Sequence, residues 1–341
     1  MQNVLSERNN ACTQAKKVSD YFVYESSKTP LPFGLVNDGA NCWGNALMQL
    51  LLSIPSLCTY IHSNPNLFEH NMSARILADT HSRVLLMPHL HPPMEAGRQF
   101  VETLKDAAVE SHQGKPGSYN HALARLRGGG QQCAEEALTL FLETLSNQRA
   151  EKIFKIRQSL TIRCTSCRAD TSVASDHSYR FFIPRTAIVD SEQLFRGYLL
   201  AHNSICSHYR CDQCHAVQGN CNRIERLRCL GEVFIVVFDK ISGPGPTYYP
   251  ERLSFPSVAG APPLQYQLVA AIEHYGSSGL RDTPESDNPA RAPMNFHTSG
   301  HYAARVLRQG EWYMINDSSV SRTSFQVSSD TFMLAYHMCG N

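Results

Sequence analysis

The chain has 341 residues, 42% of them hydrophobic and 18% charged, which is the balance of a globular protein that buries a sizeable core. Its 31 Lys and Arg residues nearly cancel its 30 Asp and Glu residues, so we expect neither nucleic acid nor a membrane surface as a partner. No apolar run is long enough for a membrane span, and the first twenty residues lack the apolar segment of a secretory signal. We therefore expect a reducing location, cytoplasmic or nuclear, in which cysteines act as free thiols, ligands or nucleophiles.

The first half of the chain is predicted to be mainly helical. Residues 1–30 are polar and weakly periodic, so we expect an N-terminal extension there. A loop from Leu31 leads into WGNALMQLLLSI, where apolar residues recur at helical spacing and Pro55 lies near the helix end. Further helices are predicted over 72–110 and 132–157.

The second half is predicted to be mainly sheet. From residue 159 the chain is rich in β-branched and aromatic residues, and strands are expected at SLTIRC, HSYRFFIP, RIERLRCLGEVFIVVFDK, YQLVAAIEHY, HYAARVLR, EWYMIND and TFMLAYHM. Helices first and strands later indicate an α+β fold, with a helical lobe against a mostly antiparallel sheet. The Pro- and Ser-rich segment 277–300 is a predicted loop placed to gate the residue that follows it, His301.

Cys42 is a candidate nucleophile. We expect it in the first turn of a helix, where free backbone N–H groups and the helix dipole stabilise a thiolate and lower its pKa. Gly39 permits a tight bend in the loop before it, and the amide of Asn37 would lie near the sulfur as a donor to an oxyanion. The alternative is a small buried residue at the start of a core helix, so the interpretation depends on a matching histidine.

His301 is the matching candidate for a general base. Gly300 allows a close backbone approach, and the alternation after it places His301 at the start of a strand. After a turn at residues 309–310, EWYMIND returns as a second strand, which brings Asn316 and Asp317 across from His301. Either side chain could accept from the imidazole and fix its tautomer. The alternative is a polar residue on an exposed strand face.

Two CxxC pairs form a candidate metal site. Of the 12 cysteines, seven lie between Cys164 and Cys229, and Cys164, Cys167, Cys211 and Cys214 form the two pairs. Two such turns can offer four thiolates to one tetrahedral Zn²⁺, and a metal would stabilise a sheet segment that has little core of its own. Free thiols are the alternative. Further candidate ligands are Cys206, His208, His215, Cys221 and Cys229.

Several segments together resemble the ubiquitin-specific proteases. GLVNDGANCWGNALMQLL resembles their cysteine box, roughly GLxNxGNTCYxNxxLQxL. The later segments resemble their YxLxAVxxHxGxxxxGHYxA and WxxxDDxxV patterns, GGGQQCAEEALTLFLETL resembles their QQDAxEFLxxLL helix, and TFMLAYHM resembles their closing strand. The likeness keeps the family's order from about Leu31 to the C-terminus.

The resemblance implies a papain-like cysteine peptidase with a helical thumb, zinc-binding fingers and an antiparallel-sheet palm. It implies that Cys42 is the nucleophile, His301 the base, Asn316 the third member of the triad and Asn37 the oxyanion donor, with Asp317 in support. It further implies a catalytic domain over 31–341, divided into thumb (31–157), fingers with part of the palm (158–240) and palm (241–341). His274 matches the family's earlier histidine and is expected to be structural.

Three positions depart from the family pattern. Cys133 stands where the family has the Asp of its QQD motif, a carboxylate that helps hold the basic tail of ubiquitin. Trp43 replaces the Tyr after the nucleophile, which makes NCWGNA similar also to papain-like proteases of some RNA viruses and fits a divergent or viral member. Asn316-Asp317 stands where the family has two carboxylates.

The predicted function is that of a thiol-dependent deubiquitinase with a structural Zn²⁺. It would hydrolyse the peptide or isopeptide bond after the C-terminal Gly of ubiquitin or a ubiquitin-like modifier. One alternative is a papain-like protease that processes a polyprotein with the same triad. Another is a catalytically weak module that binds a ubiquitin-like partner.

Overall fold

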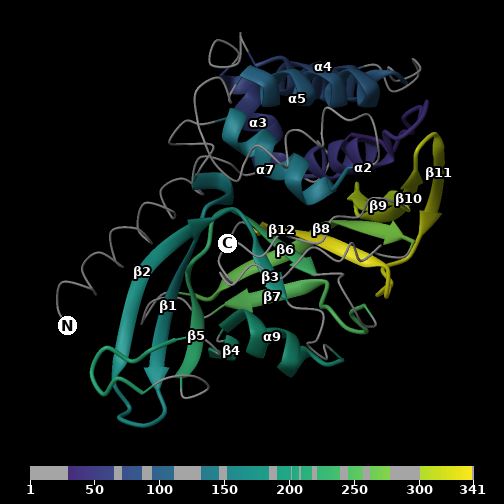
Figure 1. Ribbon diagram of the computed structural model, residues 1–341. Helices are drawn as coiled ribbons and strands as arrows, with labels where there is room; N and C mark the ends of the chain where they lie inside the picture. The colour runs from purple at the N-terminus through teal and green to yellow at the C-terminus, as the bar shows by residue number, and fades with distance from the viewer. Residues whose placement is uncertain are drawn as a thin grey trace.

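The computed structural model describes residues 30–64, 71–86, 94–110, 132–145, 152–183, 190–200, 202–206, 209–216, 221–238, 245–255, 262–276 and 300–339. Figure 1 shows a group of helices above a large sheet, and a smaller sheet that projects from it. The expected N-terminal extension, up to residue 29, and the expected loop 277–299 lie outside the described residues.

The helices of the upper lobe, the thumb, are arranged around α2. All ten residues of α2 are buried, which explains its nearly unbroken apolar sequence. The described helices are α2 (Cys42–Leu51), α3 (Pro55–Ser63), α4 (Met72–Leu86), α5 (Ala96–Glu110), α7 (Ala134–Thr144) and, below the large sheet, α9 (Glu192–Leu200). Among the described residues no single helix could span a membrane, and only the pair α2 and α3, bent by 82°, reaches the required length and apolarity together.

Two helix predictions need correction. The predicted helix 72–110 is two helices, α4 and α5, and the sequence between them contains Pro92 and Pro93, which cannot continue a helix. In the predicted helix 132–157, α7 ends at Thr144, residues 152–154 are again helical, and strand β1 begins at Ile156. Pro55 lies near the end of α2, as predicted, and it also begins α3, where a proline loses no hydrogen bond.

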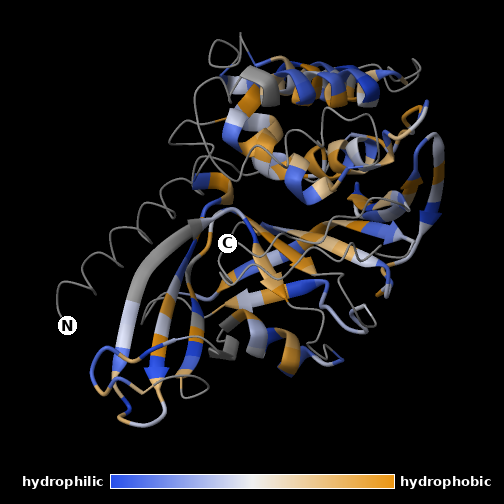
Figure 2. Ribbon diagram, viewed as in Figure 1, coloured by the Kyte–Doolittle hydropathy of each residue, from blue (hydrophilic) through white to orange (hydrophobic). Residues whose placement is uncertain are grey.

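The large sheet, the palm, has eight strands in the order β11-β10-β9-β8-β12-β6-β3, with β7 paired to β8. Strand β6 is buried on both faces: Val233, Ile235 and Val237 belong to the core beneath the thumb, and Phe234, Val236 and Phe238 to the core beside α9. Its strands are β3 (Phe181–Ile183), β6 (Val233–Phe238), β7 (Arg252–Phe255), β8 (Leu264–Tyr275), β9 (His301–Arg308), β10 (Glu311–Asn316), β11 (Ser319–Thr323) and β12 (Thr331–Met338). Figure 2 shows apolar residues concentrated where the helices meet this sheet.

The small sheet, the fingers, has the order β2-β1-β5-β4 and projects away from the thumb (Figure 1). Its described core consists of Cys164, Cys211 and Cys221, with Ile162 and Tyr209 packed against them. A sheet with so small an apolar core needs another source of stability. Its strands are β1 (Ile156–Cys164), β2 (Asp170–Ser178), β4 (His202–Cys206) and β5 (Cys221–Cys229).

Arg308, the last residue of β9, binds the end of α2 and so connects this helix to the palm. Its side chain is fully buried and donates to the carbonyl oxygens of Leu52 (2.7 Å) and Gln49 (3.1 Å), at the C-terminal end of α2. These carbonyls have no partner inside the helix, and the guanidinium also matches the negative end of the helix dipole. The helix that begins at Cys42 is therefore held by the sheet at its far end.

A pair of histidines lies inside the thumb. His62 Nε2 of α3 and His81 Nδ1 of α4 are 2.9 Å apart, and His81 is only 4% exposed. Burial, together with the positive charges of His62 and Arg308, lowers the pKa of His81 to about 4. His81 is therefore neutral in the folded protein at neutral pH.

Replacement of this histidine should change how stability depends on pH. Between pH 6.5 and 4 an unfolded His81 binds a proton that the folded one rejects, so the free energy of unfolding falls as pH falls, by up to about 1.4 kcal/mol per pH unit. His81→Gln should make this slope shallower, measured by urea unfolding at several pH values. Parallel curves for the two proteins would contradict the assignment.

Candidate active site

The loop that leads to Cys42 is held by the hairpin β10-β11. Leu35 N–H donates to the carbonyl oxygen of Asp317 at 2.9 Å. A Cβ on Gly34 would lie 2.4 Å from the Ser318 carbonyl oxygen, so only glycine permits this approach. Asn37 Oδ1 accepts from the N–H groups of Gly39 (3.3 Å) and Asn41 (3.2 Å), which closes the bend directly before α2.

Cys42 is the first residue of α2, as predicted, but its thiol is not activated in the way that the sequence indicated. Its side chain is only 4% exposed, and burial raises its pKa above the ordinary value, helped by the negative charge of Asp317. The N–H groups of Tyr302, Trp43 and Cys42 itself act in the opposite direction without reversing the shift. The predicted lowering by the helix terminus is therefore wrong for this state, because desolvation of the thiolate outweighs the N–H groups.

His301 begins β9, and Asn316 ends the neighbouring strand β10. Their side chains meet, with His301 Nε2 2.6 Å from Asn316 Oδ1. Because an amide oxygen can only accept, the imidazole carries its proton on Nε2, and Nδ1 is left able to take up another proton. The next residue after the histidine, Tyr302, directs its N–H at the Cys42 sulfur, so the histidine and the thiol belong to one site.

Asp317 connects the separate parts of this site. Its Oδ2 accepts from Asn37 Nδ2 at 2.9 Å and lies 3.7 Å from His301 Nε2, and its Oδ1 accepts from Asn45 Nδ2 at 2.8 Å. Its backbone has a φ of 50°, which is uncommon outside glycine but tolerated by aspartate. The carboxylate thereby joins the loop, the helix and the hairpin.

The structure brings together the five residues predicted for the site, Cys42, His301, Asn316, Asn37 and Asp317. Asn45 was not predicted, although the signal was present: a polar residue one turn after Cys42 in a helix whose only other polar side chain with an amide is Gln49. His274, expected to be structural, is buried and packs on the ring of Tyr302, with centroids 4.4 Å apart.

Cys133 lies directly before α7 and is buried. Its thiol contacts the hydroxyl of Tyr302, the residue whose N–H reaches Cys42. Nearby in α7, the buried carboxylate of Glu135 forms an ion pair with Arg180. Neither side chain therefore offers a free carboxylate at this end of α7.

The four predicted metal ligands form one cluster. The sulfurs of Cys164, Cys167, Cys211 and Cys214 all lie within 4.8 Å of one another. Cys164 Sγ is 3.6 Å from Cys214 Sγ, and Cys167 Sγ is 3.7 Å from Cys211 Sγ. A tetrahedral Zn²⁺ with Zn–S bonds of about 2.3 Å would separate its sulfur ligands by about 3.8 Å, so the spacing fits such an ion.

The two knuckles have the same backbone. In each, the backbone N–H of the first cysteine donates to the carbonyl oxygen of the residue five positions later, at a distance of 3.0 Å. The two bonds join Cys164 to Ala169 and Cys211 to Ala216. The residue after each second cysteine, Arg168 or His215, has a positive φ, 60° and 58°. Of the further candidate ligands, His215 and Cys221 lie outside the cluster. The side chains of His208, Cys206 and Cys229 lie outside the described part of the structure.

The sequence model of one protein family, described as ubiquitin carboxyl-terminal hydrolase, matches residues 33–336. The chain belongs to the ubiquitin carboxyl-terminal hydrolase family. It is 25% identical over 331 residues to Ubiquitin carboxyl-terminal hydrolase 26 of Oryza sativa subsp. japonica. That match covers 86% of this chain and 26% of the rice protein, so the chain spans about a quarter of the length of that relative.

Solved structures confirm the α+β fold of this family member. A SAGA DUB module, Ubp8/Sgf11/Sus1/Sgf73 bound to monoubiquitin, superposes with a TM-score of 0.64 at 15% identity, over 97% of this chain and 75% of that one. The same module bound to ubiquitin aldehyde gives a TM-score of 0.62 at 15% identity, over 93% and 72%. The arrangement of thumb, fingers and palm is thus that of known ubiquitin-specific proteases.

The raised thiol pKa of this hydrolase-family chain can be measured directly. Because only the thiolate reacts, we expect alkylation of Cys42 by iodoacetamide to accelerate by about tenfold per pH unit up to pH 9 without a plateau. Mass spectrometry of the Cys42 peptide would follow the rate, and Cys42→Ser would identify the labelled site. A plateau near neutral pH would instead indicate a preformed thiolate.

Proposed function

We propose that this chain is a thiol-dependent deubiquitinase in which Cys42 is the nucleophile, His301 the general base and Asn316 the residue that orients it. The observation that carries the proposal is the 2.6 Å contact from His301 Nε2 to Asn316 Oδ1, beside a cysteine at a helix N-terminus. This contact fixes the tautomer in which Nδ1 can accept the thiol proton. Since the resting thiol is protonated, attack and proton transfer would be coupled when a substrate is bound.

The proposed reaction proceeds through a thioester. The Cys42 thiol gives its proton to His301 Nδ1, and the sulfur adds to the carbonyl carbon of the C-terminal Gly of the modifier. The side-chain amide of Asn37 donates one N–H of Nδ2 to Asp317. Its second N–H and the backbone N–H of Cys42 would donate to the oxyanion. The C–N bond then breaks as His301 returns the proton to the leaving amine, and water hydrolyses the thioester.

Ubiquitin is the substrate that the relatives support best. The rice relative is named a ubiquitin hydrolase, and the similar solved structures hold monoubiquitin or ubiquitin aldehyde. Cys133 replaces the Asp of the QQD motif, and the neighbouring Glu135 is paired with Arg180. We therefore propose ubiquitin or a ubiquitin-like modifier as the partner. We expect its basic C-terminal tail to be held differently from the family pattern.

A binding module is the second candidate. The observation that favours it is the raised pKa of Cys42, since a protonated thiol is a poor nucleophile. Its fold and partner would be those of the enzyme, and only the chemistry would be absent. Covalent trapping separates the two candidates, and cleavage-site mapping separates both from a polyprotein-processing protease.

The test is incubation of the purified chain with ubiquitin, and in parallel with ubiquitin-like modifiers, each carrying an electrophilic C-terminal warhead. We expect a covalent adduct on Cys42, none with Cys42→Ala, and adduct formation at least tenfold slower with Asn316→Ala, because the tautomer is no longer fixed. Intact mass spectrometry would detect the adducts. Binding of ubiquitin without any adduct would replace the enzyme by the binding module.

We further propose that the cysteine cluster of the fingers holds a structural Zn²⁺. Four sulfurs at this spacing fill a tetrahedral site, so no position remains open for a substrate or water. A bound Zn²⁺ requires thiolate ligands, and its own charge would keep the four sulfurs deprotonated. None of the described cysteines forms a disulfide, and the location that we propose is a reducing one, cytoplasmic or nuclear.

Loss of one ligand should release the metal and loosen the fingers. Cys211→Ser is expected to lower bound zinc from about one ion per chain to near zero, with a lower Tm, because the described core of this sheet is small. Metal analysis after exhaustive dialysis and thermal unfolding give the two readouts. Cys339→Ser, at an exposed cysteine far along the chain, is the control, and a stable wild type free of metal would refute the proposal.

A further inference from the structure

Tyr275 lies directly beside the catalytic histidine proposed above. It is the last residue of β8, and in the antiparallel pairing of β8 with β9 it is the register partner of His301. Side chains of such partners extend from the same face of the sheet, with Cβ atoms about 5 Å apart. Since β9 lies between β8 and β10, His301 is flanked by Asn316 on one side and by Tyr275 on the other.

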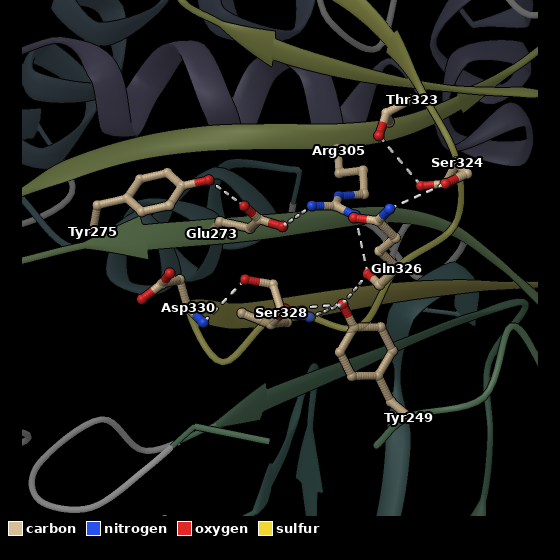
Figure 3. A network of polar contacts seen from close by, with 10 residues as sticks. Tyr249, Glu273, Tyr275, Arg305, Thr323, Ser324, Gln326, Ser328 and Asp330 are labelled. Carbon is tan, nitrogen blue, oxygen red and sulfur yellow. Dashed lines mark hydrogen bonds and ion pairs between the residues drawn. The ribbon is translucent and has the colours of Figure 1, made fainter. Parts of the chain in front are cut away.

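The ring of Tyr275 is held in one orientation by a buried ion pair. Its hydroxyl donates to Glu273, two residues earlier on the same strand. Glu273 is only 1% exposed, and Arg305 Nη2 lies 2.7 Å from its other oxygen. Arg305 in turn donates to the carbonyl oxygen of Gln326 at 3.0 Å, and Figure 3 shows this chain of contacts running from the tyrosine across the sheet.

The ion pair between Glu273 and Arg305 accounts for the position of the Tyr275 hydroxyl. It does not account for the exposure of the Tyr275 ring to solvent. A buried Glu and Arg pair contributes little net stability, because desolvation offsets most of the attraction. Yet the aromatic residue at its end keeps 36% of its surface exposed, next to the general base. A rigid, partly exposed aromatic ring is a favourable contact surface, since little conformational entropy is lost when a ligand packs on it.

We propose that Tyr275 is a specificity-determining residue that contacts the leaving group, the lysine and its flanking residues from which the modifier is released. The inference rests on the proposed deubiquitinase function. When the C–N bond breaks, His301 must reach the leaving nitrogen at about 3 Å to return the proton. The four methylenes of that lysine then pass the flank of His301, where the exposed edge of Tyr275 offers them an apolar surface.

The position of Tyr275 predicts different effects of its replacement on two substrates with different leaving groups. Ubiquitin joined by an isopeptide bond to a lysine peptide has a leaving group that can pack on Tyr275. Ubiquitin ethyl ester requires the same nucleophile, base and oxyanion donors, but its leaving group is too small to reach the ring. The specificity constant kcat/KM covers the step in which the leaving group departs, so it reports the contact.

The test compares Tyr275→Ala with wild type on both substrates. We expect kcat/KM to fall about tenfold for the isopeptide substrate and less than about twofold for the ester. Tyr275→Phe, which keeps the ring but loses the hydroxyl bond to Glu273, should lie between the two proteins. Thermal unfolding of each variant would establish that it is folded.

Tyr313→Ala provides a matched control. Tyr313 also donates to a glutamate two residues earlier, Glu311 (3.1 Å), and that glutamate also pairs with an arginine, Arg322. It is the register partner of Val306 rather than of His301. Its replacement should leave the ratio of the two specificity constants unchanged.

Each other outcome overturns the inference. An equal loss of kcat/KM on both substrates would give Tyr275 a structural role in the sheet. An unchanged kcat/KM on both would show that Tyr275 does not contact the substrate. If wild type forms the warhead adduct but Tyr313→Ala shifts the ratio as strongly as Tyr275→Ala, the effect is not local to His301. If wild type cleaves neither substrate, the proposed function fails, and the leaving-group contact fails with it.

Discussion

The carboxylate of Asp317 is the interaction on which the geometry of the site depends. It joins three segments that are far apart in the sequence, through Asn37 of the loop, Asn45 of the helix and its own hairpin beside His301. Hydrogen bonds to a charged acceptor contribute about 1.5–3 kcal/mol each, more than neutral ones. The same charge raises the pKa of Cys42, so the group that assembles the site also disfavours its thiolate.

The elements with strong periodicity could be predicted from the sequence. The apolar repeat of α2 and the alternation along β9 and β10 placed Cys42, His301 and Asn316 correctly on their elements, and the CxxC spacing identified the four clustered sulfurs. Each of these elements, and each CxxC pair taken by itself, is defined by residues close together in the chain. Local patterns are enough to recognise them.

Other features depend on tertiary contacts and were missed. The thiol pKa was wrong because burial by the thumb and palm outweighs the local effect of a helix terminus. Asn45 gave no sign of its partner, since Asp317 lies 272 residues away. Strand β1 begins earlier than predicted because Ile156 is buried beside α9 and the palm, a context that helix propensity does not contain.

The fingers and the palm are stabilised in different ways. The palm has apolar residues on both faces of β6, so its stability comes from burial. The described core of the fingers is three cysteines with two neighbouring side chains. The stability of the fingers therefore depends less on apolar burial than that of the palm.

The helix that carries Cys42 is held by the palm at both ends. Asn45 connects its first turn to Asp317, and Arg308 binds the carbonyls at its last turn. Because α2 shares one apolar core with α4, α5 and the palm, these contacts fix it to the sheet in addition to its packing within the thumb. A helix bound at both ends to the sheet that carries His301 keeps the sulfur and the imidazole in a constant relative position, so the two groups need no realignment when a ligand binds.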